Sequence, residues 1–458
     1  MLEASGFTVA LAPPNHLSSC PGYGRPEPCR PREEDVSLSR QEARVLDRLD
    51  LEGMLGFLEK LVAVPSVGGA ESPAQELVAR WMEENGLEVD VWEVDLPALR
   101  AHPAYSAEVH RDEALGVVGL LGEDEGGRKL ILNGHVDVVP PGDPSSWSFH
   151  PWEGRVMDGR VRGRGALDMK GGLACALYVA KAVKEAGVRL EGQVILESVV
   201  GEEDGGLGTL AAIQRGYRGD GAVVVEPTGL AICPAQAGAL SFRITVRGKA
   251  AHGCVRDRGV SALEKVWPVH QELLALEAKR NHLSHGPLFE AYGTPFPLSV
   301  GVIRGGDWPS SVPDWIQLEG RYGLIPGESV EEAQAAFLTA LENAATRDPW
   351  LREHRPELEG WGGRFLPAIT SEDEAVVSIL RESVSDVLGE DPRLEGVPYG
   401  SDLRHLVLEG GTPTVLFGPG EVASAHVPDE TIAVEDLERA MRALAVMVMR
   451  FCGRRRDD

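Results

Sequence analysis

Histidine and carboxylate residues stand where several apolar runs of this sequence end. Five of them share this placement: His135, Asp137, Glu202, Glu203 and Glu226. In open parallel sheets, ligands gather beyond the carboxyl ends of the strands. Imidazole and carboxylate groups are also the usual nitrogen and oxygen ligands of catalytic zinc. The placement therefore points to metal chemistry, in which bound ions activate water for hydrolysis.

Two motifs could bring ligands close to an ion. His135 and Asp137 are two residues apart at a strand end, so they face the same way, and the carboxylate could orient a metal-bound imidazole. Asp168 lies between Gly165 and Gly171 at the mouth of a helix, and the glycines permit a close approach of the backbone to a ligand. Taken alone, each motif has an ordinary structural explanation, such as a paired loop histidine or a helix-capping aspartate.

The adjacent carboxylates Glu202 and Glu203 could divide two tasks. One could bind a metal ion while the other moves a proton. Glu226 follows a buried run, and His426 lies in a loop far along the chain. A surface charge pair, a solvated strand end and a structural loop histidine are the ordinary alternatives.

The elements that must position these residues alternate between apolar runs and helical segments. This pattern predicts an α/β fold, with a mainly parallel sheet covered by helices on both faces. The predicted strands are residues 129–133, 193–200, 222–225 and 413–417. The predicted helices of this part are residues 50–64, 72–85, 171–186 and 434–451. Capping boxes of Ser72 with Gln75 and Ser371 with Glu374 predict two helix starts.

The pattern of apolar residues changes near residue 235, and this change predicts an inserted domain. Alternating strands at residues 239–247, 298–303 and 315–324, with helices at 261–277 and 329–345, indicate a smaller α+β unit. We therefore divide the chain into a disordered leader, two parts of a catalytic domain and the insert between them. The ranges are 1–38 for the leader, 39–234 and 367–458 for the catalytic domain, and 235–366 for the insert.

The composition excludes some partners. The net charge of −26, from 71 acidic and 45 basic residues, argues against nucleic acid and anionic membranes. No apolar run approaches the roughly 20 residues that span a bilayer, so we expect a cytoplasmic protein. The six cysteines include no Cys-x-x-Cys pair, so a thiolate metal site is not expected.

Taken together, the ordered motifs resemble the M20 family of metallopeptidases and deacylases. The resemblance runs from about residue 51 to residue 452. Its matching pieces are Gly134-His135-Val136-Asp137, Gly163-Arg164-Gly165-Ala166-Leu167-Asp168-Met169-Lys170-Gly171-Gly172, Gly201-Glu202-Glu203, Glu226-Pro227-Thr228, Ala251-His252, Ser401-Asp402 and Ala425-His426.

This resemblance implies a site for two divalent ions, zinc by preference, with cobalt or manganese as alternatives. Asp168 would bridge both ions. His135 and Glu226 would complete one ion, and Glu203 and His426 the other. Glu202 would be the general base and acid, and Asp137 would orient His135. The resemblance also implies a cis peptide bond between Asp168 and Met169.

The insert resembles the family's lid, which implies a homodimer through the lid. His252 matches a lid histidine that reaches the neighbouring subunit's site and helps to hold the oxyanion. Arg321 is a candidate clamp for a substrate carboxylate. Ser310 stands where many relatives have asparagine, which leaves its role in substrate binding open, and Ser401 is a third candidate for that role.

The expected function is hydrolysis of an amide bond in a small carboxylate-bearing molecule. An N-acyl amino acid is the first candidate substrate, as for an acetylornithine deacetylase. Three motifs in combination resemble this branch: Glu226-Pro227-Thr228, Val397-Pro398-Tyr399-Gly400-Ser401-Asp402 and Ala425-His426-Val427-Pro428-Asp429-Glu430. A dipeptidase or carboxypeptidase is the alternative within the family. A non-catalytic binding protein on the same fold is the alternative from another class.

Overall fold

The computed structural model describes residues 38–282 and 286–453. The predicted leader, residues 1–38, lies almost entirely outside this part of the chain. Within the described ranges, no helix combines the length and apolar content needed to cross a bilayer.

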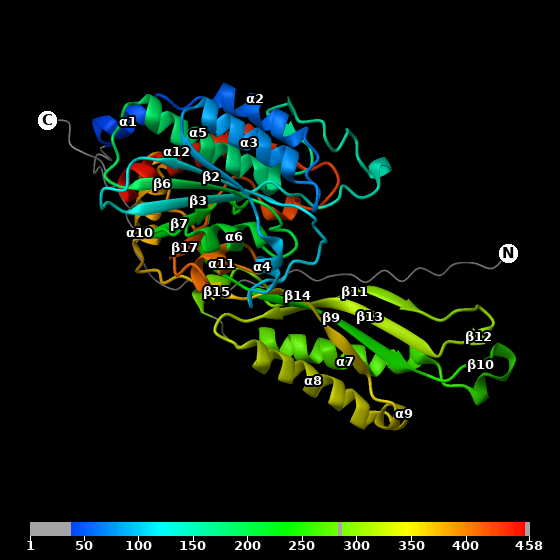
Figure 1. The fold of residues 1–458 in the computed structure, drawn as a ribbon. Coiled ribbons are helices and arrows are strands. Elements are labelled where there is room, and N and C mark those ends of the chain that lie inside the picture. The colour runs from blue at the N-terminus through cyan, green and yellow to red at the C-terminus, as the bar shows by residue number, and fades with distance from the viewer. Residues whose placement is uncertain (1–37, 283–285, 454–458) are drawn as a thin grey trace, which may run out of the picture. The chain divides into compact units, whose positions relative to one another are not determined.

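A nine-stranded sheet forms the centre of the larger part of the fold (Figure 1). Its main path runs β1-β2-β6-β3-β7-β17-β8-β15, and β16 pairs with β8. These strands are β1 (Glu88–Glu93), β2 (Leu115–Leu121), β3 (Lys129–His135), β6 (Gln193–Val199), β7 (Gly221–Val224), β8 (Ile232–Gln236), β15 (Ala368–Ile369), β16 (Leu394–Val397) and β17 (Thr414–Leu416).

The middle of this sheet is parallel, and its outer strands are mixed. Strand β3 pairs in parallel with β6 and β7, and β17 pairs in parallel with β7. By contrast, β1 with β2, β2 with β6, and β8 with β15 are antiparallel. The carboxyl ends of β3, β6 and β7 therefore lie side by side. The expected metal ligands are located at or just after these strand ends.

Helices cover the sheet on both faces. The connections β3 to β6 and β6 to β7 cross the sheet in opposite directions, so right-handed crossovers place α5 and α6 on opposite faces. The helices of this part are α1 (Arg40–Leu46), α2 (Leu51–Val62), α3 (Ser72–Glu84), α4 (Leu96–Arg100), α5 (Gly171–Glu185), α6 (Leu207–Arg215), α10 (Ala375–Leu388), α11 (Leu403–Leu408) and α12 (Val434–Phe451). A separate three-stranded sheet is formed by β4 (Arg155–Met157), β5 (Arg160–Arg162) and β18 (Thr431–Ala433), in the order β18-β5-β4.

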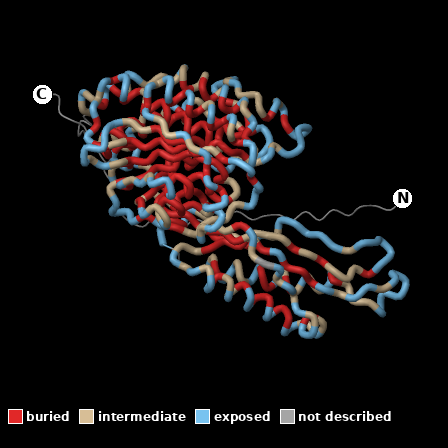
Figure 2. Tube along the Cα trace, viewed as in Figure 1, coloured by how far each residue is buried: buried red, intermediate tan, exposed pale blue. Residues whose placement is uncertain are grey.

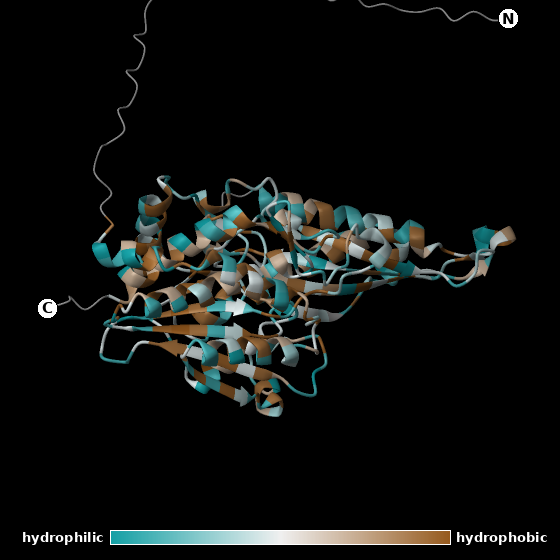
Figure 3. Ribbon diagram, turned by 90° about the horizontal axis from the view of Figure 1, so that it is seen from above, coloured by the Kyte–Doolittle hydropathy of each residue, from teal (hydrophilic) through white to brown (hydrophobic). Residues whose placement is uncertain are grey.

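The central strands and inner helices form one hydrophobic core. Figure 2 shows the strands of the main sheet mostly buried, and Figure 3 shows hydrophobic residues along them. Leu130, Ile131 and Leu132 of β3 are all fully buried. Such runs without alternation are typical of strands covered on both faces.

The expected insert contains its own antiparallel sheet, in the order β11-β13-β9-β14. Its strands are β9 (Gly238–Arg247), β11 (Leu298–Gly305), β13 (Trp315–Leu324) and β14 (Glu357–Phe365), with the short pair β10 (Ala251–His252) and β12 (Ser311–Val312). Its helices are α7 (Ala262–Asn281), α8 (Val330–Arg347) and α9 (Pro349–Glu353). A separate core that includes Phe242, Tyr322 and Phe337 lies under this sheet. The limits 235–366 remain our proposal for the lid.

Both predicted capping boxes are wrong. Helix α3 begins at Ser72 itself, its N-cap Glu71 makes no side-chain cap, and the Ser72 hydroxyl donates to Glu113 instead, at 3.0 Å. Helix α10 begins at Ala375, and its N-cap Glu374 also lacks a side-chain cap. The spacing was correct for a box, but α3 starts one residue before the position that its box requires, and α10 starts three residues after the position that its box requires.

Candidate metal centre

His135 ends β3 and turns its two ring nitrogens to different partners. Its Nδ1 lies 2.8 Å from the main-chain oxygen of Asp137, which can only accept, so Nδ1 donates. The Asp137 carboxylate is farther away, at 3.6 Å, and accepts the main-chain N–H of Glu203 at 3.1 Å. Nε2 faces the carboxylates of Asp168 and Glu226, at 3.3 and 3.9 Å. Asp137 thus orients both His135 and the loop that carries Glu203.

Asp168 lies between two imidazoles. Its Oδ1 is 3.3 Å from Nε2 of His135, and its Oδ2 is 3.2 Å from Nε2 of His426. One carboxylate oxygen therefore faces each histidine, as a bridging ligand between two ions requires. The Asp168–Met169 peptide bond is cis, as the resemblance implied.

The remaining carboxylates lie in two groups that share His135. Glu203 Oε1 lies 3.1 Å from Nε2 of His426. Ligand atoms of His135, Asp168 and Glu203 lie within 4.8 Å of one another, and the same is true of His135, Glu202 and Glu226. The structure therefore brings together seven predicted residues: His135, Asp137, Asp168, Glu202, Glu203, Glu226 and His426.

The buried carboxylates of this cluster need nearby positive charge in order to ionise. Burial raises the pKa of Glu202 well above its ordinary value, and the charge of Glu226 raises it further. Burial and the charge of Asp168 do the same for Glu226. Hydrogen bonds to Asp168 and Glu203 raise the pKa of His426 to about 10. So many buried carboxylates do not ionise together unless positive charge is supplied, and divalent ions supply it. The donor set fits such ions.

Other predicted residues lie apart from this cluster. His252 is exposed on β10 and Ser310 is exposed beside β12. Strand β9 alone spans ten residues, or about 33 Å, between the start of the lid and this end. His252 does not belong to the groups of converging ligand atoms found among the described residues.

Arg321 and Ser401 are engaged with other protein groups. Arg321 donates to the main-chain oxygen of Pro398 at 2.8 Å, and it lines a cavity of about 700 Å³ with Arg243 and Trp361 on the lid sheet. No residue of the metal cluster lines that cavity. The Ser401 hydroxyl donates to Gln236 at 2.5 Å. Their roles in substrate binding remain proposals.

Two buried ion networks near the site were missed from sequence. Arg111 donates to both oxygens of Asp204 and to Glu71, at 2.6–3.0 Å, and so holds the loop after Glu203. Glu430 pairs with Arg164 at 2.5 Å. Asp204 directly follows one quoted motif and Glu430 ends another, but their arginine partners lie 93 and 266 positions away in the chain. No local pattern shows such pairs.

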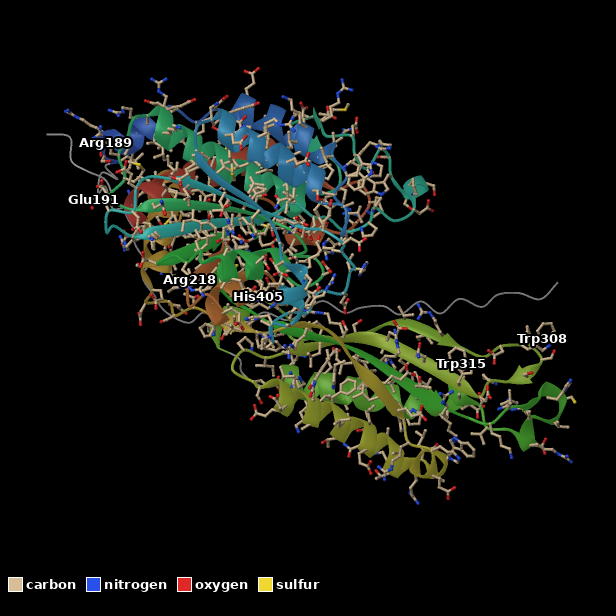
Figure 4. The ribbon with its side chains drawn as sticks, in the orientation of Figure 1. Arg189, Glu191, Arg218, Trp308, Trp315 and His405 are labelled. Carbon is tan, nitrogen blue, oxygen red and sulfur yellow. The ribbon has the colours of Figure 1, made fainter. Side chains whose placement is uncertain are left out.

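The loop of Glu202 and Glu203 is also fixed from α11. Arg404 and His405 both donate to the main-chain oxygen of Gly205, at 2.8 and 3.1 Å (His405 is labelled in Figure 4). Burial lowers the pKa of His405 well below its ordinary value, which keeps this imidazole neutral. The turn that carries the adjacent glutamates is thus held from two sides.

A buried carboxylate behind the site gives a pH-dependent prediction. Glu197 on β6 accepts from Asn133 at 2.9 Å, and burial raises its pKa from 4.5 to about 7. Between these values the folded state holds a proton that the unfolded state releases, so stability falls as pH rises from about 4.5 to 7. Glu197→Gln should therefore be more stable than the wild type at pH 8, by about 1–3 kcal/mol, and equally stable near pH 4. Calorimetric unfolding at both values measures this. A difference that does not change with pH would contradict it.

Comparisons with known proteins identify the family. The chain matches Peptidase family M20/M25/M40 over residues 131–450. It is 30% identical to an N-formyl-4-amino-5-aminomethyl-2-methylpyrimidine deformylase of Halalkalibacterium halodurans over 428 residues, which cover 88% of this chain and 96% of that protein. It is 31% identical to an acetylornithine deacetylase of Myxococcus xanthus, over 75% of this chain and 86% of that one.

Solved structures show the same fold. The dipeptidase Dug1p from Saccharomyces cerevisiae matches with a TM-score of 0.71 at 16% identity, over 91% of this chain and 99% of that one. A tripeptidase from Staphylococcus aureus matches with a TM-score of 0.67 at 21% identity, over 88% of this chain and 99% of that one. The resemblance to this group, first drawn from the motifs, is confirmed. The chain belongs to peptidase family M20/M25/M40 and is a metal-dependent hydrolase of amide or peptide bonds.

Proposed function

We propose that this enzyme uses two divalent ions to remove the acyl group from a small N-acyl amino acid. The observation that carries this proposal is the placement of Asp168, with one oxygen toward His135 and the other toward His426. Two of its relatives are named for removing a formyl or an acetyl group from an amine. These names favour a deacylase over a dipeptidase, since the peptidase structures share only the fold at 16–21% identity.

The ligands divide between two positions. His135, Glu226 and Asp168 would hold one ion, and Glu203, His426 and Asp168 the other, with zinc, cobalt or manganese as candidates. Ions bound there lower the pKa of water and polarise the scissile carbonyl. The acyl carbon would then lie within reach of Glu202, which follows the carboxyl end of β6.

The residues of the chain perform the proton transfers. Glu202 takes the proton from the attacking water and passes it to the leaving amine. Burial and neighbouring negative charges hold the pKa of Glu202 high in the free protein, which strengthens this carboxylate as a proton acceptor. Asp137 keeps His135 in one orientation during these steps.

A second candidate reaction is deformylation of an aminomethyl-pyrimidine. Identity of 30% over 88% of the chain to a deformylase of that kind supports it. Both candidates break an amide between a small acyl group and an amine. They differ in the amine, because the amino acid carries a carboxylate for which Arg321 is the candidate clamp.

We also propose a homodimer through the lid. Leu263, Trp267 and Leu274 are 60, 59 and 46% exposed, and their spacing places them on one face of α7. Ile303, 66% exposed, lies on β11, one of the two edge strands of the lid sheet. Exposed apolar helix faces and open sheet edges are typical of interfaces. Trp308 and Trp315 lie toward the β10 end of the lid, where the chain also carries His252 (Figure 4).

An amine-release assay tests the reaction. Purified enzyme with added zinc, cobalt or manganese is given N-acetyl and N-formyl amino acids, the N-formyl aminomethyl-pyrimidine and dipeptides. We expect the best N-acyl amine to exceed the best dipeptide at least tenfold in kcat/KM. Protein with Glu202→Gln, prepared in the same way, excludes a contaminating hydrolase. A dipeptide as the best substrate would overturn the deacylase proposal.

A further inference from the structure

Glu430 is a buried glutamate that touches the loop of the bridging aspartate. It is 1% exposed and lies four positions after His426. Its Oε1 accepts the main-chain N–H groups of Gly165, Leu167 and Asp168, at 2.9, 3.0 and 3.3 Å. A single carboxylate oxygen thus gathers three amides of the segment that ends at Asp168.

The other oxygen of Glu430 balances a buried charge. Oε2 lies 2.5 Å from Nη1 of Arg164, whose side chain is also buried. The Arg164 guanidinium lies 5.2 Å from the ring centre of Trp147, and its Nε has no hydrogen-bond partner within residues 38–282 and 286–453. Without Glu430, this guanidinium would keep a buried charge with no carboxylate beside it, which is costly.

The same residue joins two loops that carry ligands. The main-chain oxygen of Glu430 accepts from Gly163 at 3.0 Å, while its side chain holds the segment up to Asp168. His426 precedes Glu430 in the same loop, and its backbone has a positive φ of 59°. The relative positions of Asp168 and His426 therefore depend on contacts made by Glu430.

Direct coordination by Glu430 does not fit these contacts. Both of its oxygens are occupied by protein donors, and it is absent from the groups whose ligand atoms converge in the described chain. A carboxylate that bonds to the loop behind a ligand, without touching the ion, fixes the geometry of that ligand.

We propose that Glu430 is a positioning residue that holds Asp168 and His426 at the separation needed to share two metal ions. This inference rests on the proposed two-metal site. Partners of this kind are worth about 10- to 100-fold in metal affinity or activity. Glu430 acts through Asp168 and touches neither ion nor substrate.

Metal affinity of Glu430→Gln tests this inference. Glutamine keeps the shape and can still accept the three amides, but its NH2 group would face the Arg164 donor and leave the charge unbalanced. Metal-free protein is titrated with zinc against a competing chelator, and cobalt absorption reports the coordination geometry. We expect zinc affinity about 10- to 100-fold weaker than wild type and an altered cobalt spectrum.

The matched control is Glu272→Gln. Glu272 is also a buried glutamate, and it pairs with Arg347 between α7 and α8 of the lid. We expect it to change thermal unfolding without changing zinc affinity or the cobalt spectrum. The conservative variant Glu430→Asp keeps the charge and should give an intermediate affinity; if Glu430→Gln does not fold, this variant decides by the same criterion.

The outcomes separate the two proposals. If wild type binds two ions and folded Glu430→Gln binds them equally tightly, the positioning role is wrong and the proposed function stands. If wild type itself binds no zinc, the proposed two-metal function fails.

Discussion

Replacing Glu202 by glutamine is expected to lower kcat at least ~10²-fold while the enzyme keeps its metal. Glutamine has the size of glutamate but cannot accept the proton of the attacking water. Oε1 of Glu202 is buried and has no hydrogen-bond partner among the described residues, so it is available for that proton. Steady-state kinetics and metal analysis of the same preparation measure both effects. The matched control is Glu197→Gln, a second buried glutamate near the end of β6, for which kcat should stay within a few-fold of wild type.

The metal content of the Glu202→Gln enzyme shows whether Glu202 is a general base or a metal ligand. Glu202 lies within ligand distance of His135 and Glu226, so geometry alone permits either role. Asp168→Ala removes the bridging carboxylate, and we expect it to lose metal and activity together. If Glu202→Gln also loses metal, Glu202 is a ligand and the base must be sought elsewhere. If it keeps most of its activity, the assignment fails altogether.

The parallel centre of the fold and the gathering of ligands were predictable from sequence. Strands buried on both faces leave continuous apolar runs, as in residues 129–133 and 222–225, and these runs occur in β3 and β7. Because such strands end at one edge of the sheet, His135 and Glu226 had to meet there. The placement of His426 came only from the resemblance, since it follows no strand of the predicted set.

Long-range contacts and local helix starts were not predictable. The antiparallel strands β1 and β2 depend on pairings across the sheet, which periodicity does not record. The box of Ser72 with Gln75 failed because tertiary contacts gave the Ser72 hydroxyl another partner, Glu113. Glu430 lay inside a quoted motif, but its role depends on Arg164 and the Asp168 loop, 262–266 positions earlier in the chain.

The lid histidine gives the second large expected effect. His252 is exposed on β10 and is outside the ligand cluster of its own chain. If the partner subunit supplies it to hold the oxyanion, His252→Ala and Glu202→Gln enzymes should each be inactive, yet their mixture should regain activity.

The size of this recovery follows from symmetry. In a mixed two-fold dimer, one site combines the intact Glu202 of one chain with the intact His252 of the other, and the second site lacks both. Random exchange makes half of the dimers mixed, so about a quarter of all sites are complete. We therefore expect about a quarter of the wild-type rate after subunit exchange. Exchange itself is followed with two differently tagged chains.

Subunit exchange without recovery of activity would mean that His252 acts in the site of its own chain or takes no part in the reaction. A His252→Ala enzyme with wild-type kcat would remove its oxyanion role. Lid closure over bound substrate would bring an exposed histidine into place only in the complex, so recovered activity tests this role more directly than any distance in the free protein.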